Sequence, residues 1–116
     1  GRTWEVHSRK GTIQLTAETF ESLQITCEQG KVLLSLPKSF RGTVKILSEV
    51  VGLDRLTSKV THFWQTEPVV FETVMTEEKG RAVPQYFRYV FEKKLGEDSS
   101  TLLVRVKNSD LEILSF

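Results

Sequence analysis

The side chains best suited to chemistry are one cysteine and two histidines, Cys27, His7 and His62. A histidine can act as a general base or bind a metal, and a cysteine beside it can become a nucleophile. His62 has no cysteine or second histidine at a metal-binding spacing, and nothing around Cys27 resembles a catalytic elbow. The sequence therefore favours structural roles for all three residues. It predicts no catalytic residue, no metal site and no cofactor.

Acidic pairs are a second source of acid–base chemistry. Glu77 is followed by Glu78, and Glu97 by Asp98, but both pairs fall in polar segments where solvation is their usual role. The sequence also lacks a glycine-rich phosphate loop and a Gly-x-Ser-x-Gly elbow. A small hydrolase that combines a histidine with a carboxylate or the cysteine is thus the least favoured function.

Aromatic and basic residues are better candidates for binding. Flat aromatic rings can stack on sugars or on a protein partner, although rings in strands usually fill the core. The segment 86–91 alternates aromatic residues on both faces of a strand, so one face is expected in the core and the other on a contact surface. A small basic patch at a chain corner can hold an anion or simply be solvated. The candidate binding surface comprises Trp4, Trp64, Tyr86, Tyr89, Lys38 and Arg41.

The composition is that of an ordinary globular protein. The 116 residues suit a single domain, and 39% of them are apolar and 27% charged. Sixteen basic and fifteen acidic side chains are interspersed along the chain, so charge does not favour nucleic acid. No apolar run approaches the roughly 20 residues of a membrane span. The single cysteine and the lack of a signal-peptide pattern favour an intracellular location, and the abrupt start at Gly1 suggests a chain trimmed from a longer one.

Alternation of apolar and polar residues predicts strands along nearly the whole chain. Glycines in the gaps and a spacing near ten residues indicate about ten short strands in two packed sheets, as a β-sandwich or a β-solenoid-like roll. We expect further strand residues at Leu53 and Leu56, a strand over 69–75 begun by Pro68, and an exposed loop over 76–81. We also expect the segments 86–94 and 101–107 to form a hairpin, and a last strand to use Leu111 and Ile113.

An internal repeat gives the strongest indication of architecture. The segments Gly11–Ile25 and Gly30–Ile46 both read as strand, corner and strand. In the second copy, Pro37 ends the first strand, Phe40 can tuck under the corner, and Gly42 permits a tight return. Aligned on their glycines, the two copies match Ile13, Leu15, Ala17, Phe20, Leu23 and Ile25 with Val32, Leu34, Leu36, Phe40, Val44 and Ile46.

The corner Leu36-Pro37-Lys38-Ser39-Phe40-Arg41-Gly42 resembles the core of an uncharacterised fungal domain family found in mushrooms and their relatives. The segments Gly11-Thr12-Ile13-Gln14-Leu15 and Gly30-Lys31-Val32 resemble strands of that family, and the likeness covers residues 8 to 64. The wider pattern is also similar to bacterial adhesin-type domains built of β-coils. These resemblances imply a β-rich fold and carry no established activity, cofactor or site residue.

Taken together, the sequence predicts one all-β domain over residues 1–116 that is not an enzyme. The expected function is protein–protein binding or self-assembly, because strands left at a sheet edge can accept another strand, and the strand over 86–94 is expected to carry this contact. A carbohydrate-binding module that uses exposed tryptophan and tyrosine rings is the alternative.

Overall fold

The computed structural model describes residues 2–52 and 58–116, and these contain ten strands and no helix. The predicted strand residues Leu53 and Leu56 lie outside the described part. The strands are β1 (Thr3–Ser8), β2 (Gly11–Thr16), β3 (Ser22–Cys27), β4 (Gly30–Leu36), β5 (Gly42–Val50), β6 (Val60–His62), β7 (Glu72–Glu78), β8 (Arg81–Leu95), β9 (Thr101–Lys107) and β10 (Ser109–Ser115). They form two packed sheets, so the all-β prediction is confirmed.

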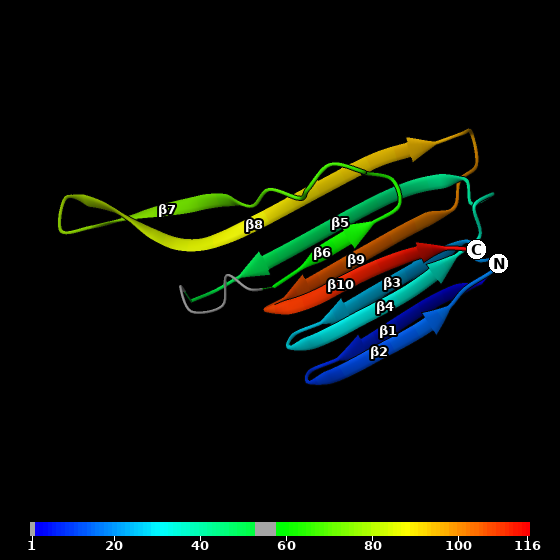
Figure 1. Ribbon diagram of the computed structural model, residues 1–116, viewed down its shortest axis with the longest axis horizontal. Coiled ribbons are helices and arrows are strands. Elements are labelled where there is room, and N and C mark those ends of the chain that lie inside the picture. The colour runs from blue at the N-terminus through cyan, green and yellow to red at the C-terminus, as the bar shows by residue number, and fades with distance from the viewer. Residues whose placement is uncertain (1, 53–57) are drawn as a thin grey trace.

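The two sheets are faces of one stack of coils (Figure 1). One sheet has the order β1-β3-β9-β5-β8-β7, and the other has the order β2-β4-β10-β6. Within the stack, neighbouring strands run parallel, because each coil crosses from one sheet to the other before the next coil begins. The result is a solenoid-like roll, in which every coil contributes one strand to each sheet.

The order of coils in space differs from their order in the chain. The last coil, β9 with β10, lies between the coil of β3 and β4 and the coil of β5 and β6 (Figure 1). The chain therefore leaves a gap in the stack after β4 and fills it with its C-terminal strands. Strand β9 therefore pairs with β3 on one side and with β5 on the other.

The repeat identified in the sequence is a pair of stacked coils. Ile13 pairs with Val32 and Leu15 with Leu34, as the alignment predicted. The rings of Phe20 and Phe40 also stack, with centroids 5.4 Å apart. The second strands of the copies are not direct neighbours, because β9 lies between them.

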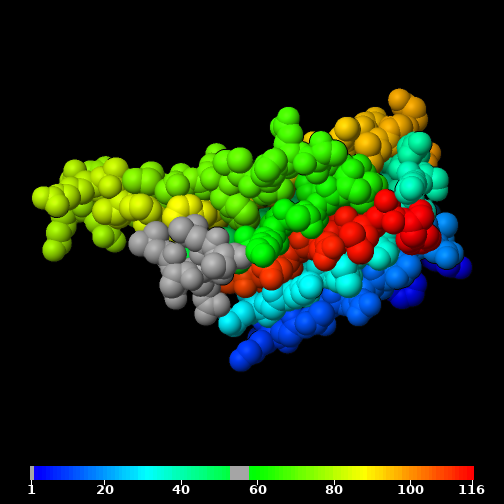
Figure 2. Space-filling model, viewed as in Figure 1, coloured from blue at the N-terminus to red at the C-terminus, as the bar shows by residue number. Residues whose placement is uncertain are grey.

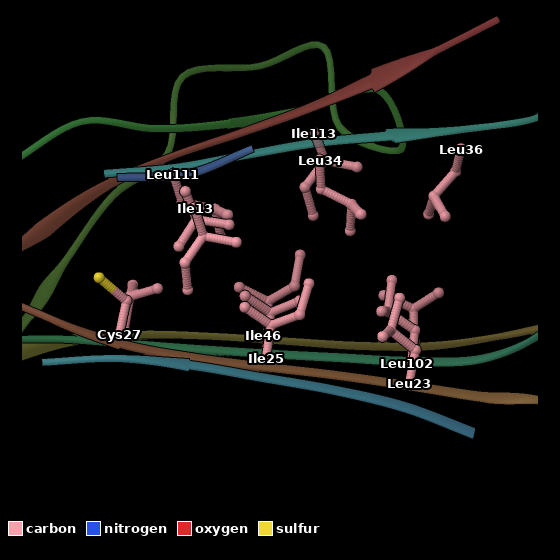
Figure 3. Packing of buried hydrophobic residues seen from close by; sticks show 14 of the residues in the cluster. Ile13, Leu23, Ile25, Cys27, Leu34, Leu36, Ile46, Leu102, Leu111 and Ile113 are labelled. Carbon is pink, nitrogen blue, oxygen red and sulfur yellow. The ribbon is translucent and has the colours of Figure 1, made fainter. Parts of the chain in front are cut away.

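Side chains from the two sheets meet in a single apolar core between them (Figure 3). Alternate residues of β3, β4, β5, β9 and β10 point inward and are buried, which is the two-residue period that the sequence showed. Coils approach closely at Gly30, which has a φ of +147° and pairs with Gly11. A Cβ atom there would lie 1.8 Å from the carbonyl oxygen of Gly11, so only glycine fits.

Strands β7 and β8 form an antiparallel ribbon at the end of the six-stranded sheet opposite β1. The C-terminal half of β8 pairs with β5, and its first half pairs with β7 and stands out beyond the coils (Figure 2). The predicted exposed loop over 76–81 is wrong, because Lys79 and Gly80 alone make the turn of this hairpin. The predicted strand over 69–75 begins later, at Glu72, and the predicted hairpin of 86–94 with 101–107 is wrong because β5 separates β8 from β9.

No helix long and apolar enough to cross a membrane occurs among the described residues.

Candidate functional site

The first coil leaves an apolar hollow at its end of the stack. In the described part of the chain, β1 and β2 each pair with a neighbour on one side only. Their inward side chains border an open hollow of about 330 Å³. Its lining consists of Arg2, Trp4, Val6, Leu15, Thr16, Ala17, Glu18, Thr19, Phe20 and Leu23. We call this part of the described stack, the strands β1 and β2 with the hollow between them, the open end.

The hydrogen-bonding direction of β1 is fixed by its pairing with β3. The carbonyl of Ser8 accepts a hydrogen bond of 3.0 Å from the N–H of Glu28. In a parallel pair, alternate residues turn both backbone groups toward the neighbour, so the even-numbered residues of β1 bond to β3. The groups that face away from the stack therefore belong to Thr3, Glu5 and His7.

The same reasoning applies to β2. The N–H of Ala17, just after the strand, donates to the carbonyl of Ser35 at 3.0 Å, and the N–H of Gly11 donates to that of Gln29. Odd-numbered residues of β2 thus bond toward β4. Their neighbours Thr12, Gln14 and Thr16 point their backbone groups away from the stack. Both edges can add another strand.

The side chains at the open end combine an apolar centre with charges on the outer face. Trp4 is 55% exposed, although its equivalent in the next coil, Leu23, is buried. Glu5 and His7 are exposed on the outer face of β1. His7 Nε2 also lies 4.0 Å from Glu28 Oε2 on β3. A strand added beside β1 would cover the Trp4 indole and would lie next to the side chains of Glu5 and His7.

Among the residues of this site, sequence reasoning singled out Trp4 as a binding candidate and His7 as a candidate for chemistry. Leu15 and Phe20 were named only as matched positions of the internal repeat, and Glu5 was not singled out. The repeat itself carried a partial signal, because repeated strand–corner–strand segments are expected to stack as successive coils. The sequence did not reveal which coil would be terminal.

The other aromatic candidates do not gather into one platform. Tyr89 is buried and so lies beneath the surface. Trp64 is half-buried and packs against Phe40 and Phe91, with centroids 6.5 Å and 6.3 Å away. Tyr86 lies on β8 where this strand pairs with β7. Tyr86 and Tyr89 lie on β8 and Trp64 follows β6, whereas Trp4 lies on β1 at the opposite end of the described stack.

A buried polar network joins His62, Tyr89 and Gln65. The Tyr89 hydroxyl donates to Gln65 Oε1 at 2.8 Å and lies 2.8 Å from His62 Nε2. Because the hydroxyl has one proton, Nε2 must carry the hydrogen and donate to Tyr89. His62 Nδ1 is buried and has no hydrogen-bond partner among the described residues. Burial lowers the pKa of His62 and raises the pKa of Tyr89.

The network has a structural role. It connects the chain after β6 to β8 and keeps the His62 ring in contact with neighbouring aromatic rings. His62 lies 4.5 Å from Phe91 and 5.8 Å from Trp64, measured between ring centroids. The neutral imidazole fits this apolar setting better than the charged form.

The basic candidates Lys38 and Arg41 are exposed at the corner after β4. Arg41 Nη1 donates to the carbonyl of Phe40 at 2.9 Å, so its guanidinium closes the corner. Glu18 and Asp98 line the same shallow hollow as Arg41. These carboxylates oppose the binding of an anion there.

The Cys27 side chain is buried, and its sulfur lies 3.6 Å from Ser109 Oγ, which donates its proton to the carbonyl of Lys107 at 2.7 Å. No three His, Cys, Asp or Glu side chains among the residues described come together in a way that could hold a metal ion.

Comparison with known proteins adds no information on the function of this chain. No family model matches the chain, and searches of curated proteins and of solved structures found no match. The resemblance of the corner over 36–42 to a fungal domain family stays a prediction.

Proposed function

We propose that this chain is a noncatalytic β-domain that binds protein by strand addition at the open end of its stack. The observation that carries the proposal is the combination of two unpaired edges, β1 and β2, with an apolar hollow between them. Backbone groups at such an edge supply affinity, and the side chains around it supply specificity.

The contrast between the two ends of the stack supports this choice. At the far end, β8 and β7 extend the larger sheet, and Phe63, Trp64, Val69 and Phe71 pack against the core. A half-exposed indole above a hollow is costly to leave in water, since burial of apolar surface contributes about 25 cal/mol per Å². Covering the indole and the hollow would therefore favour the binding of a partner at the open end.

A noncatalytic role agrees with the placement of the groups considered for chemistry. The His7 and Glu28 side chains form an exposed pair on the outer face of the sheet. Cys27 points into the core instead, and His62 is enclosed by aromatic rings. A hydrolase needs nucleophile and base within hydrogen-bond reach of one substrate, and this arrangement separates them.

Selection of binders from a displayed library of extended peptides tests strand addition. We expect selected peptides to slow amide hydrogen exchange at Thr3, Glu5 and His7 or at Gln14. The variant Gln14→Pro removes one outward donor and should weaken peptides that add to β2, because proline cannot donate to a ladder. Val90→Ala on β8 is the matched control. Selection that yields no binder, or binders that protect only β7, would refute the proposal.

Carbohydrate binding is a second candidate, favoured by the exposed Trp4 indole alone. Stacking on a sugar ring should change the fluorescence of wild type and leave a Trp4→Ala variant unchanged. A glycan array without signal would remove this candidate.

A further inference from the structure

We infer that the partner at the open end is a second copy of this chain, paired head to head about a two-fold axis. The inference rests on the proposed strand addition and names its occupant. A two-fold axis perpendicular to the sheets sets β1 antiparallel to its own copy. The same axis sets β2 beside its copy, so both edges are paired at once and the interface closes on itself. The two open hollows then face each other and exclude water together.

The backbone of β1 permits few registers. Its outward groups belong to the odd-numbered residues, so odd residues must face odd residues across the interface. Two such registers are centred on the strand. One places Val6 opposite Val6 of the second copy, and the other places Glu5 opposite Glu5.

Charge selects the first of these registers. With Val6 on the axis, Glu5 lies directly opposite His7 of the second copy, and symmetry repeats the pair. A carboxylate can accept a hydrogen bond from a facing imidazole, whereas like charges directly opposite each other destabilise a sheet. With Glu5 on the axis, two carboxylates would meet directly. Glu5 and His7 are both exposed on the outer face, so nothing else in the described structure buries them.

Size selects the same register. With Val6 on the axis, Trp4 lies opposite Ser8 of the second copy, where a small side chain leaves room for the indole. Trp4 is 55% exposed in the single chain and would be covered in the pair. In the register centred on Glu5 the indole would instead oppose Val6, which is half-buried already.

Disulfide trapping tests the register directly. Val6 would form a non-hydrogen-bonded pair with its copy, and the Cα atoms of such pairs are about 4.5 Å apart, within the range of a disulfide. In a Cys27→Ala background, Val6→Cys should give a covalent dimer after mild oxidation. Glu5→Cys is the control, because it is more exposed but faces His7. A covalent dimer from Glu5→Cys with none from Val6→Cys would refute this register.

Light scattering of the unmodified chain and of charge variants completes the test. His7→Glu places carboxylates opposite each other and should weaken dimerisation roughly ten-fold. The double variant Glu5→His with His7→Glu restores opposite partners and should recover most of that loss. A chain that stays monomeric at about 1 mM, the limit of weak association, refutes the second copy as partner. If that monomer still binds selected peptides at β1, strand addition stands; if it binds none, both proposals fall.

Discussion

Replacement of Gly30 by alanine tests the stacking of the coils at its closest point. Gly30 has a φ of +147°, which side-chain-bearing residues rarely adopt. The added Cβ would lie 1.8 Å from the oxygen of Gly11, 2.7 Å from its carbonyl carbon and 2.9 Å from its nitrogen. All three atoms are backbone, so no side chain can turn aside to make room.

The expected loss of stability follows from two contributions. The unfavourable backbone conformation costs about 1–3 kcal/mol. Relief of the overlap must move the first coil away from the second, which weakens the ladder between β2 and β4. Loss of two of its hydrogen bonds costs about 1 kcal/mol each. The total is about 3–5 kcal/mol, a large part of the stability of a typical domain.

Gly80→Ala is the matched control. Gly80 also has a positive φ, of +76°, but a Cβ there meets nothing within 4 Å. Gly80→Ala should therefore cost only the free energy of the unfavourable backbone conformation, about 1–2 kcal/mol. Urea unfolding followed by fluorescence should show Gly30→Ala less stable than Gly80→Ala by about 1–4 kcal/mol. A difference below about 0.5 kcal/mol, within the error of such extrapolations, would refute the close contact of the coils.

Three further predictions concern buried polar groups. Because burial lowers the pKa of His62, the unfolded chain binds a proton that the folded chain does not, so the free energy of unfolding should fall as the pH drops below 6.5, and this part of the pH dependence should vanish in His62→Gln. Tyr89→Phe removes the partner of both His62 Nε2 and Gln65 Oε1 and should lower the free energy of unfolding by about 1–3 kcal/mol; an unchanged urea midpoint would contradict the network. Ser48→Ala removes a buried hydroxyl that has no hydrogen-bond partner in the described structure, so thermal unfolding should show an unchanged or higher melting temperature, and a drop of several degrees would reveal a missing partner.

Much of the fold could be predicted from the sequence because strand periodicity is a local property. Alternation identified the inward residues of β4 and β5, and glycine spacing gave the register of the first two coils. The predictions failed where pairing joins distant segments. Residues 86–94 and 101–107 are adjacent in sequence and both suit strands, yet β5 lies between them. The loop predicted over 76–81 failed because β7 and β8 continue through polar residues when each supplies the other's hydrogen bonds.

The candidate site was less accessible to sequence reasoning. Trp4 could be named from its type, but its exposure depends on the absence of a neighbour for β1 in the described stack. Tyr89 was named for the same reason and is buried, because β8 packs beside β5 and the chain after β6 covers it. The local sequence pattern around an aromatic residue in a strand is the same whether the ring is exposed, as in Trp4, or buried, as in Tyr89.

The sequence by itself determined that this chain forms short strands, that two of its segments repeat, and that glycines mark the gaps between strands. These follow from side-chain alternation and from backbone conformations that only glycine adopts freely. Only the tertiary structure decided that the C-terminal coil fills the middle of the stack and that the first coil lies at an open end. Strand neighbours are chosen by burial and hydrogen bonding across the whole chain, and no local pattern records which strand is left at the edge.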